Sequence, residues 1–177
     1  PTFVWASAIE WAFFLLEVVT ALAWVATWEK VSPKTHLLLI RLYAFAAFMS
    51  LVVIQGILGF MLTPGRFPAT ASVADGFLNP TYLPGLLFRT GVCFALGAAW
   101  MAFATLRETD RPARARLARV LAAFGAAGLG LAGIGWIAWE KALPQGVQRL
   151  FLGEKPLLAA LASGRAFTLR ALLAAAL

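Results

Sequence analysis

The sequence predicts an all-α, multi-pass membrane protein: a helix bundle of four full transmembrane helices in two antiparallel hairpins, plus the start of a fifth. The first observation is composition, because the 177 residues are 62% hydrophobic and 13% charged, whereas soluble domains carry about 25% charged residues. The second is a set of four apolar runs, each longer than the ~20 residues that cross a bilayer. The third is that most Lys and Arg lie between these runs, where topology signals lie. A lipid bilayer is therefore the expected partner, and nucleic acid is not.

The apolar runs set the expected helix boundaries, at residues 3–28, 37–62, 81–106 and 117–139. Residues 29–36 form a polar turn with Pro33 as its breaker, and residues 63–80 have the Pro, Gly and Ser content of an irregular loop. Between the third and fourth helices, residues 107–116 form a basic turn.

The two ends of the chain predict a window on a longer protein. The first residue is Pro1 and the last apolar run breaks off without a polar end. Residues 140–165 are expected to form an extramembrane segment, and residues 166–177 to open a further helix. We treat the whole of 1–177 as one transmembrane domain.

Small residues in the third and fourth helices give two expectations about packing. In the fourth helix, Ala122, Ala126 and Gly130 recur every fourth residue, a stripe that lets another helix approach closely. The single cysteine, Cys93, lies in an apolar run and is expected to be a small buried residue. One thiol supports neither an intrachain disulfide nor a cysteine-ligated cluster.

The distribution of basic residues predicts the orientation. The turns 29–36 and 107–116 hold Lys30, Lys34, Arg107, Arg111, Arg114 and Arg116. The loop 63–80 holds only Arg66. The positive-inside rule therefore places both turns in the cytoplasm, and we expect a multi-pass protein of a bacterial-type cytoplasmic (inner) membrane. Trp136 and Trp139 then fall at the outer interface, where tryptophan is enriched.

Polar side chains inside the apolar runs are the candidate functional residues. Glu10, Gln55 and Arg89 each lie about 10 Å from the outer end of their helix, at ~1.5 Å per residue. A buried carboxylate and a buried guanidinium are tolerable together and costly apart. We therefore hypothesise that Arg89 pairs with Glu10 or Glu17. The alternative is that Arg89 extends outward to the interface while Glu10 faces a neighbouring subunit.

Glu17 lies near mid-membrane and has two readings. It is either a neutral acid that is hydrogen-bonded within the bundle or part of a proton path, because carboxylates at this depth commonly mark ion and proton pathways.

Several short strings resemble one known family. Residues 8–17 contain AIE followed by FFL and a second Glu, residues 59–64 read GFMLTP, and residues 78–80 read LNP. In their order and spacing these strings resemble the central helices of subunit I of cytochrome bd-type quinol oxidases. The resemblance covers about residues 8–140 and implies a membrane helix bundle.

The chain departs from that family at the haem site. The resemblance implies a histidine ligand of the low-spin haem several residues after LNP, but Phe88 and Arg89 stand there. Neither is a usual haem ligand. The only histidine, His36, lies in the turn 29–36 and is expected to be solvated. We therefore expect no haem and no other cofactor held by this segment, while quinone binding stays open.

The resemblance implies a haem-poor relative of the oxidase subunit. Such a subunit would serve a respiratory or electron-transfer complex as a membrane anchor and a contributor to a quinone site. Its expected partners are other membrane subunits and cytochrome or iron–sulfur subunits. Two alternatives remain: a catalytic quinol oxidase with haem ligands outside this segment, and a transporter or channel, which buried Glu and Arg also suit. Whether the chain is an enzyme is left open.

Overall fold

The computed structural model describes residues 3–152, which form helices and turns with no strand in that part of the chain. The long helices are α1 (Val4–Ala26), α2 (Pro33–Leu62), α5 (Tyr82–Thr105) and α6 (Arg111–Ala142). The short helices are α3 (Phe67–Thr70), α4 (Val73–Phe77) and α7 (Gln145–Leu152). All four long helices are long and apolar enough to cross a membrane. The prediction of an all-helical chain with four membrane-length helices is confirmed, while the further helix at 166–177 lies outside the described residues.

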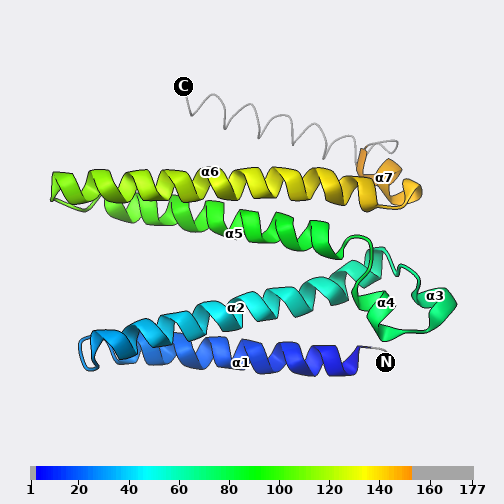
Figure 1. The fold of residues 1–177 in the computed structure, drawn as a ribbon, viewed down its shortest axis with the longest axis horizontal. Helices are drawn as coiled ribbons and strands as arrows, with labels where there is room; N and C mark the ends of the chain where they lie inside the picture. Colours follow the sequence, from blue (N-terminus) through cyan, green and yellow to red (C-terminus); the bar gives the residue numbers. More distant parts are fainter. Residues whose placement is uncertain (1–2, 153–177) are drawn as a thin grey trace.

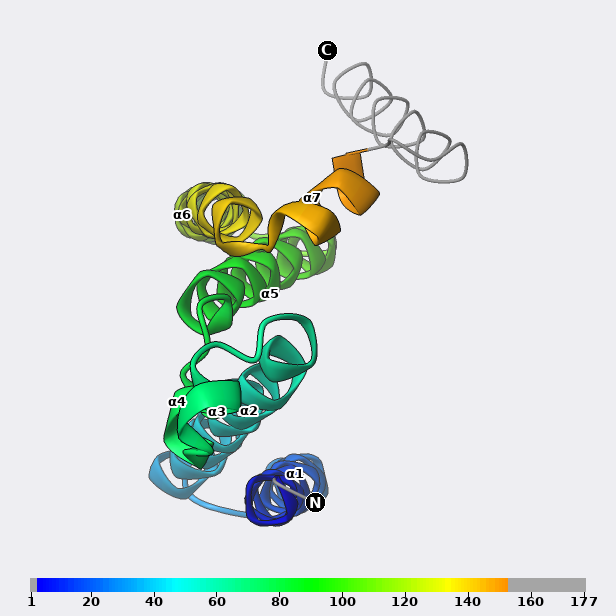
Figure 2. The ribbon, with the colours of Figure 1, turned by 90° about the vertical axis from the view of Figure 1, so that its right-hand side faces the viewer.

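The long helices stand in a row in the order α1, α2, α5, α6 (Figures 1 and 2). α1 packs along α2, and α5 packs along α6. α2 and α5 approach each other near the loop that joins them, which carries α3 and α4 (Figure 1). Because α2 lies between α1 and α5, these two helices contact α2 from different sides (Figure 2).

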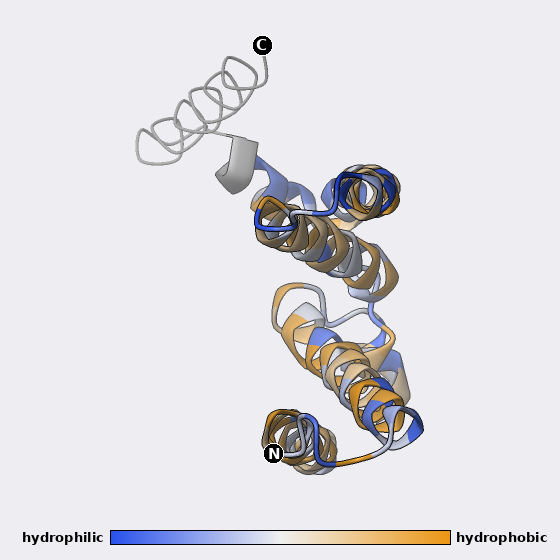
Figure 3. Ribbon diagram, turned by 90° about the vertical axis from the view of Figure 1, so that its left-hand side faces the viewer, coloured by the Kyte–Doolittle hydropathy of each residue, from blue (hydrophilic) through white to orange (hydrophobic). Residues whose placement is uncertain are grey.

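Apolar residues occur throughout the long helices (Figure 3), and many of their large side chains are exposed. Leu96 on α5 and Leu129 on α6 are 66% and 67% exposed, while buried apolar residues such as Ala46 and Ala132 are small. In water, a continuous surface of this kind would be an aggregation liability. In a bilayer it faces lipid, and the backbone polar groups are satisfied within the helices, as a membrane requires.

Two helices begin earlier than the sequence suggested, in both cases at a proline-containing turn. α2 starts at Pro33, with Ser32 as N-cap accepting a hydrogen bond from the Thr35 amide at 3.2 Å. α6 starts at Arg111 with Pro112 in its first turn. Proline fits there because it lacks only an N–H that would be unpaired anyway. Reading Pro33 as a breaker was therefore wrong, and most of the basic turn 107–116 is helical.

His36 is also placed differently from the expectation of a solvated turn residue. Its ring is half-buried and stacks on Trp24 with ring centroids 5.1 Å apart, and the edge of Trp28 is packed against it at 4.9 Å. Its Nε2 lies 3.1 Å from the Trp24 carbonyl oxygen. The reason is the early start of α2, which makes His36 part of a helix that faces the end of α1.

Glycines bring α5 and α6 into backbone contact. A Cβ added at Gly91 would collide with backbone atoms of Gly128 and Ala132, and one at Gly135 would collide with the backbone of Phe88. The predicted stripe is not on this face, because a Cβ at Gly130 would meet nothing within 4 Å. The α5–α6 contact therefore depends on residues about half a turn away from the stripe.

Cys93 does not have the buried position expected for it. It is exposed on the surface of α5. Small size and an apolar neighbourhood were the reasons for expecting burial, but in a chain of this kind apolar segments also face lipid. Cys93 therefore lies on the outer surface of the row.

The segment 63–80 is ordered around Asn79, rather than irregular. Asn79 is 3% exposed. Its amide nitrogen donates at 3.1–3.3 Å to the backbone carbonyls of Gly56, Gly76 and Phe77. Its Oδ1 accepts from the Thr63 hydroxyl and from both the amide and hydroxyl of Thr81. This buried network fixes the start of α5 against the end of α2.

Candidate ligand-binding cavity

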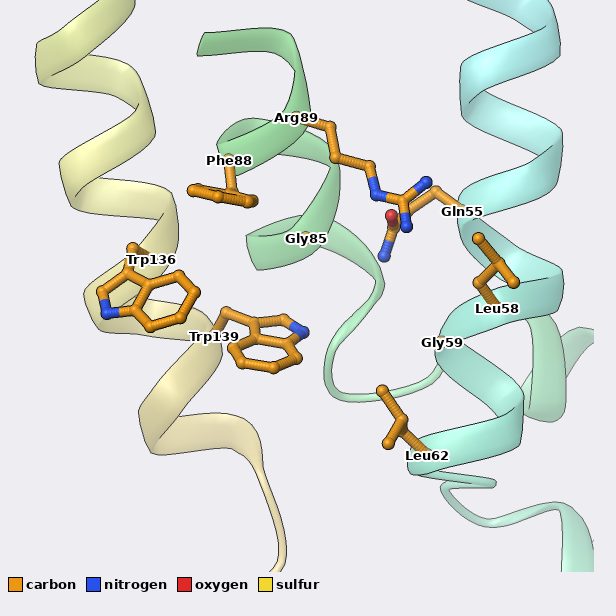
Figure 4. A pocket seen from close by; sticks show the side chains of 9 residues that line it. All are labelled: Gln55, Leu58, Gly59, Leu62, Gly85, Phe88, Arg89, Trp136 and Trp139. Atoms are coloured by element: carbon orange, nitrogen blue, oxygen red, sulfur yellow. The ribbon is translucent and has the colours of Figure 1, made fainter. Parts of the chain in front are cut away.

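A cavity of about 130 Å³ lies between α2, α5 and α6, near the end that carries α3 and α4 (Figure 4). Its lining residues are Gln55, Leu58, Gly59, Leu62, Gly85, Phe88, Arg89, Trp136 and Trp139. A buried apolar cavity of about 150 Å³ is known to accommodate benzene. The space is therefore of the size of one aromatic ring.

Gln55 is the buried polar group of this cavity. The side chain is 4% exposed, and its Nε2 donates to the Thr81 carbonyl at 3.5 Å. Its Oε1 is buried and has no hydrogen-bond partner among the described residues. A Cβ on Gly85 would collide with the Gln55 amide, so the absence of a side chain there makes room for the glutamine. A buried acceptor without a partner is uncommon, and it calls for an explanation.

Arg89 supplies a positive charge beside this acceptor. It is half-buried on α5, and its guanidinium points toward the Gln55 amide (Figure 4). Within residues 3–152 it forms no ion pair and no side-chain hydrogen bond. Both residues lie about 10 Å from the helix ends, at ~1.5 Å per residue, and a charge at membrane depth is a functional-site hypothesis by default. Of the three residues expected at one depth, Gln55 and Arg89 line this cavity, and Glu10 does not.

Aromatic rings form the opposite wall. Phe88 and Trp136 have ring centroids 5.4 Å apart, and Trp136 and Trp139 are 5.5 Å apart. Leu58 and Leu62 line the α2 side (Figure 4). The sequence assigned both tryptophans to the membrane interface only, and nothing in the spacing of a single helix could show that they face Gln55 across α5. These rings make that side of the cavity aromatic and apolar.

The carboxylates of α1 lie elsewhere. The Ser50 hydroxyl of α2 donates to Glu10 Oε1 at 3.2 Å, and Glu17 is half-buried on α1. Within the described part of the chain neither carboxylate forms an ion pair with Arg89, and α2 stands between α1 and α5 (Figure 2). The structure therefore does not contain the expected pairing of Arg89 with Glu10 or Glu17, and Glu10 has a neutral partner on α2 instead. The proton-path role of Glu17 stays a prediction.

The lining residues do not fit haem ligation. They include no His, Met, Cys or Tyr, which are the usual axial ligands. At the positions where the resemblance places a ligand, the Phe88 ring packs at a tilt against Trp136, and Arg89 points toward Gln55 (Figure 4).

The cavity offers a donor that cannot accept, an acceptor that lacks a partner, and an aromatic wall. Arg89 can donate to an oxygen of a ligand, and Gln55 Oε1 can accept from a hydroxyl or N–H. Small-molecule sites are typically of this kind, mostly apolar with a few placed polar groups.

Compared with known proteins, the chain matches no family model, no curated protein and no solved structure.

Proposed function

We propose that this chain is a membrane-integral subunit of a respiratory or other electron-transfer complex, which anchors partner subunits and binds a quinone head group. The observation that carries the proposal is the buried, unpartnered Oε1 of Gln55 beside the Arg89 guanidinium in a ring-sized cavity. The strings that resemble cytochrome bd-type oxidases favour the same class of complex. No haem is assigned to this segment.

A quinone matches the cavity in shape and polarity. Its head group is a flat ring with two opposed oxygens, so the ring can pack against the aromatic side of the cavity while one oxygen accepts from Arg89. The cavity lies near one end of the membrane-spanning helices. A tail-bearing lipid-soluble ligand reaches such a position from the bilayer, without crossing water.

The proposed partners are other membrane subunits and cytochrome or iron–sulfur subunits. We place the four spans as two antiparallel hairpins in a bacterial-type inner membrane. The exposed small-residue stripe Ala122, Ala126 and Gly130 is the face on which another membrane helix can approach closely. A transporter is the less favoured alternative, because each of the four spans is one continuous helix, whereas transporter sites are typically built on broken helices.

The quinone site is tested by replacing Arg89. In the full chain, held in lipid nanodiscs, Arg89→Gln is expected to weaken binding of radiolabelled decylubiquinone about tenfold or more, because a charge-assisted hydrogen bond is lost. Arg66→Gln is the matched control, since Arg66 is exposed and lies outside the cavity. Absence of saturable binding to the unaltered chain, or equal affinities of both variants, contradicts the proposed site.

The orientation is tested by cysteine labelling on a Cys93→Ser background. Ala69→Cys lies in the α3 segment and Glu108→Cys in the turn before α6, both exposed. In spheroplasts, a membrane-impermeant maleimide is expected to label only Ala69→Cys, because the basic turn stays in the cytoplasm. Glu108→Cys should become reactive after permeabilisation. Labelling in the reverse pattern would show the opposite orientation.

A further inference from the structure

We propose that the protein holds an anionic phospholipid between its two pairs of helices, in the wedge where α2 and α5 diverge. The phosphate is bound by one arginine from each helix, and the acyl chains lie along the apolar side chains between them. This site is separate from the proposed quinone cavity, because it lies toward the opposite end of the helices. The wedge is lined by Arg41 and Phe48 on the α2 side and by Trp100, Phe103 and Arg107 on the α5 side.

The wedge exists because α2 and α5 touch only part of the way along. Contacts between them, such as those of Gln55 with Thr81 and Gly85, lie near the loop that joins the two helices. From there the helices diverge toward the end that carries the basic turns (Figure 1). Phe48 is 47% exposed and Trp100 is 74% exposed. The facing sides of the two helices are therefore open to a ligand from the bilayer.

Helical spacing places an arginine on each facing side. On α2, Gln55 marks the side that contacts α5, and Arg41 lies 14 residues before it, about four turns away. On α5, Arg89 marks the side that faces α2 (Figure 4), and Arg107 lies 18 residues after it, about five turns away. Both Arg41 and Arg107 are exposed. Each therefore lies on the side of its helix that faces the wedge.

Aromatic rings adjoin the cation on the α5 side. A cavity of about 210 Å³ is lined by Trp100, Phe103, Ala104 and Arg107. The Trp100 and Phe103 ring centroids lie 6.4 Å apart. Among residues 3 to 152, neither Arg41 nor Arg107 forms an ion pair or a side-chain hydrogen bond. Guanidinium groups bind phosphate well, so an unpaired cation beside apolar rings matches the two parts of a phospholipid.

The charge at this end of the helices favours an anionic lipid over a second copy of the chain. Lys and Arg outnumber Asp and Glu eight to three in residues 27–41 and 104–119. A second copy would bring the same positive charge, whereas an anionic head group brings the opposite one. Arg41 lies about 12 Å from the start of α2, at ~1.5 Å per residue, and a long arginine side chain reaches the head-group level from such a position.

The test is native mass spectrometry of the full chain, titrated in detergent with phosphatidylglycerol and, separately, with phosphatidylcholine of the same acyl chains. We expect the first phosphatidylglycerol to bind about thirtyfold more tightly than the first phosphatidylcholine, because each of two arginines contributes about fivefold. Each single variant, Arg41→Gln or Arg107→Gln, should lose about fivefold of this preference. The double variant should bind both lipids equally.

The matched control is the double variant Arg116→Gln with Arg119→Gln, which removes the same charge from exposed positions of α6. Arg119 lies nine residues before Gly128, about two and a half turns away, and therefore on the opposite side of α6 from the contact of Gly128 with α5. This control should keep the preference for phosphatidylglycerol. Equal loss in both double variants would show a general effect of charge and overturn the site.

A second measurement needs no variant. Phosphatidylglycerol with a diazirine in its acyl chain is photoactivated on the full chain in nanodiscs, and the labelled peptides are identified by mass spectrometry. We expect more labelling in residues 37–48 and 96–107 than in residues 117–130. Even labelling of all these ranges overturns the proposal. Dimers that survive delipidation, together with an unlabelled wedge, also overturn it and assign the surface to a second copy.

Discussion

Replacing Gly91 with leucine is expected to disrupt the packing of α5 on α6 and to cause the largest loss of stability of any single change considered. The Cβ of the new side chain would collide with backbone atoms of Gly128 and Ala132. Overpacking costs about 1–3 kcal/mol where side chains can shift. Backbone atoms within a helix shift less readily, so we expect at least the upper end of that range.

Gly97→Leu is the matched control, because a Cβ at this position of α5 would meet nothing within 4 Å. Leucine is a better helix former than glycine by about 1 kcal/mol, so this variant should be neutral or slightly more stable. The measurement is the midpoint of thermal unfolding of the full chain in detergent, followed by its helical circular dichroism. Equal midpoints for the two variants would show that the helices do not approach each other at Gly91.

The same substitution should also abolish ligand binding. Phe88 and Trp136, which form the cavity wall, lie on the two helices that Gly91 brings together. Binding of decylubiquinone to Gly91→Leu is therefore expected to be lost, whereas Gly97→Leu should bind like the unaltered chain. Retained binding in Gly91→Leu would mean that the wall does not depend on the α5–α6 contact.

Asn79→Leu is expected to have the second-largest effect. The asparagine is 3% exposed and satisfies backbone carbonyls with its nitrogen and the Thr63 and Thr81 donors with its oxygen. Leucine has the same branching and the same number of side-chain heavy atoms but no polar group. Each buried polar group left without a partner costs about 1–3 kcal/mol, so we expect a loss of about 3 kcal/mol or more.

The control for Asn79→Leu is Gln145→Leu, which removes an exposed amide on α7. Unfolding by increasing sodium dodecyl sulfate, followed by helical circular dichroism, gives the comparison. We also expect Asn79→Leu to increase protease cutting between α3 and α5, because the network fixes this segment to α2. A variant as stable and as resistant as the control would mean that the network contributes little.

The helices were predictable because their signal is local. Four long apolar runs correspond to four membrane-length helices, and the depth of Gln55 and Arg89 along those helices followed from counting residues. The positions of Pro33 and His36 were misread because the same proline that breaks a helix interior also suits a first turn. Whether such a proline ends a helix or begins one depends on the residue before it, and here the Ser32 side chain caps the new helix by accepting from the Thr35 amide.

The partners of the polar residues were not predictable from depth. Glu10, Gln55 and Arg89 were expected at one depth in the membrane, but depth does not show which neighbouring helix a side chain faces. The lateral order of the helices decides which residues at that depth can meet. α2 stands between α1 and α5 (Figure 2), and Glu10 finds Ser50 while Gln55 lies beside Arg89.

Hydrophobicity and length act within one segment, so the amino-acid order was enough to show that the chain is helical, apolar enough to enter a bilayer and provided with a few polar groups at membrane depth. The packed helices were needed to show which glycines join α5 to α6, that Asn79 orders the segment before α5, and that Gln55, Arg89 and two tryptophans share one cavity. These features depend on contacts between helices, and the lateral order of helices in a membrane is set by packing and hydrogen bonding rather than by hydrophobicity.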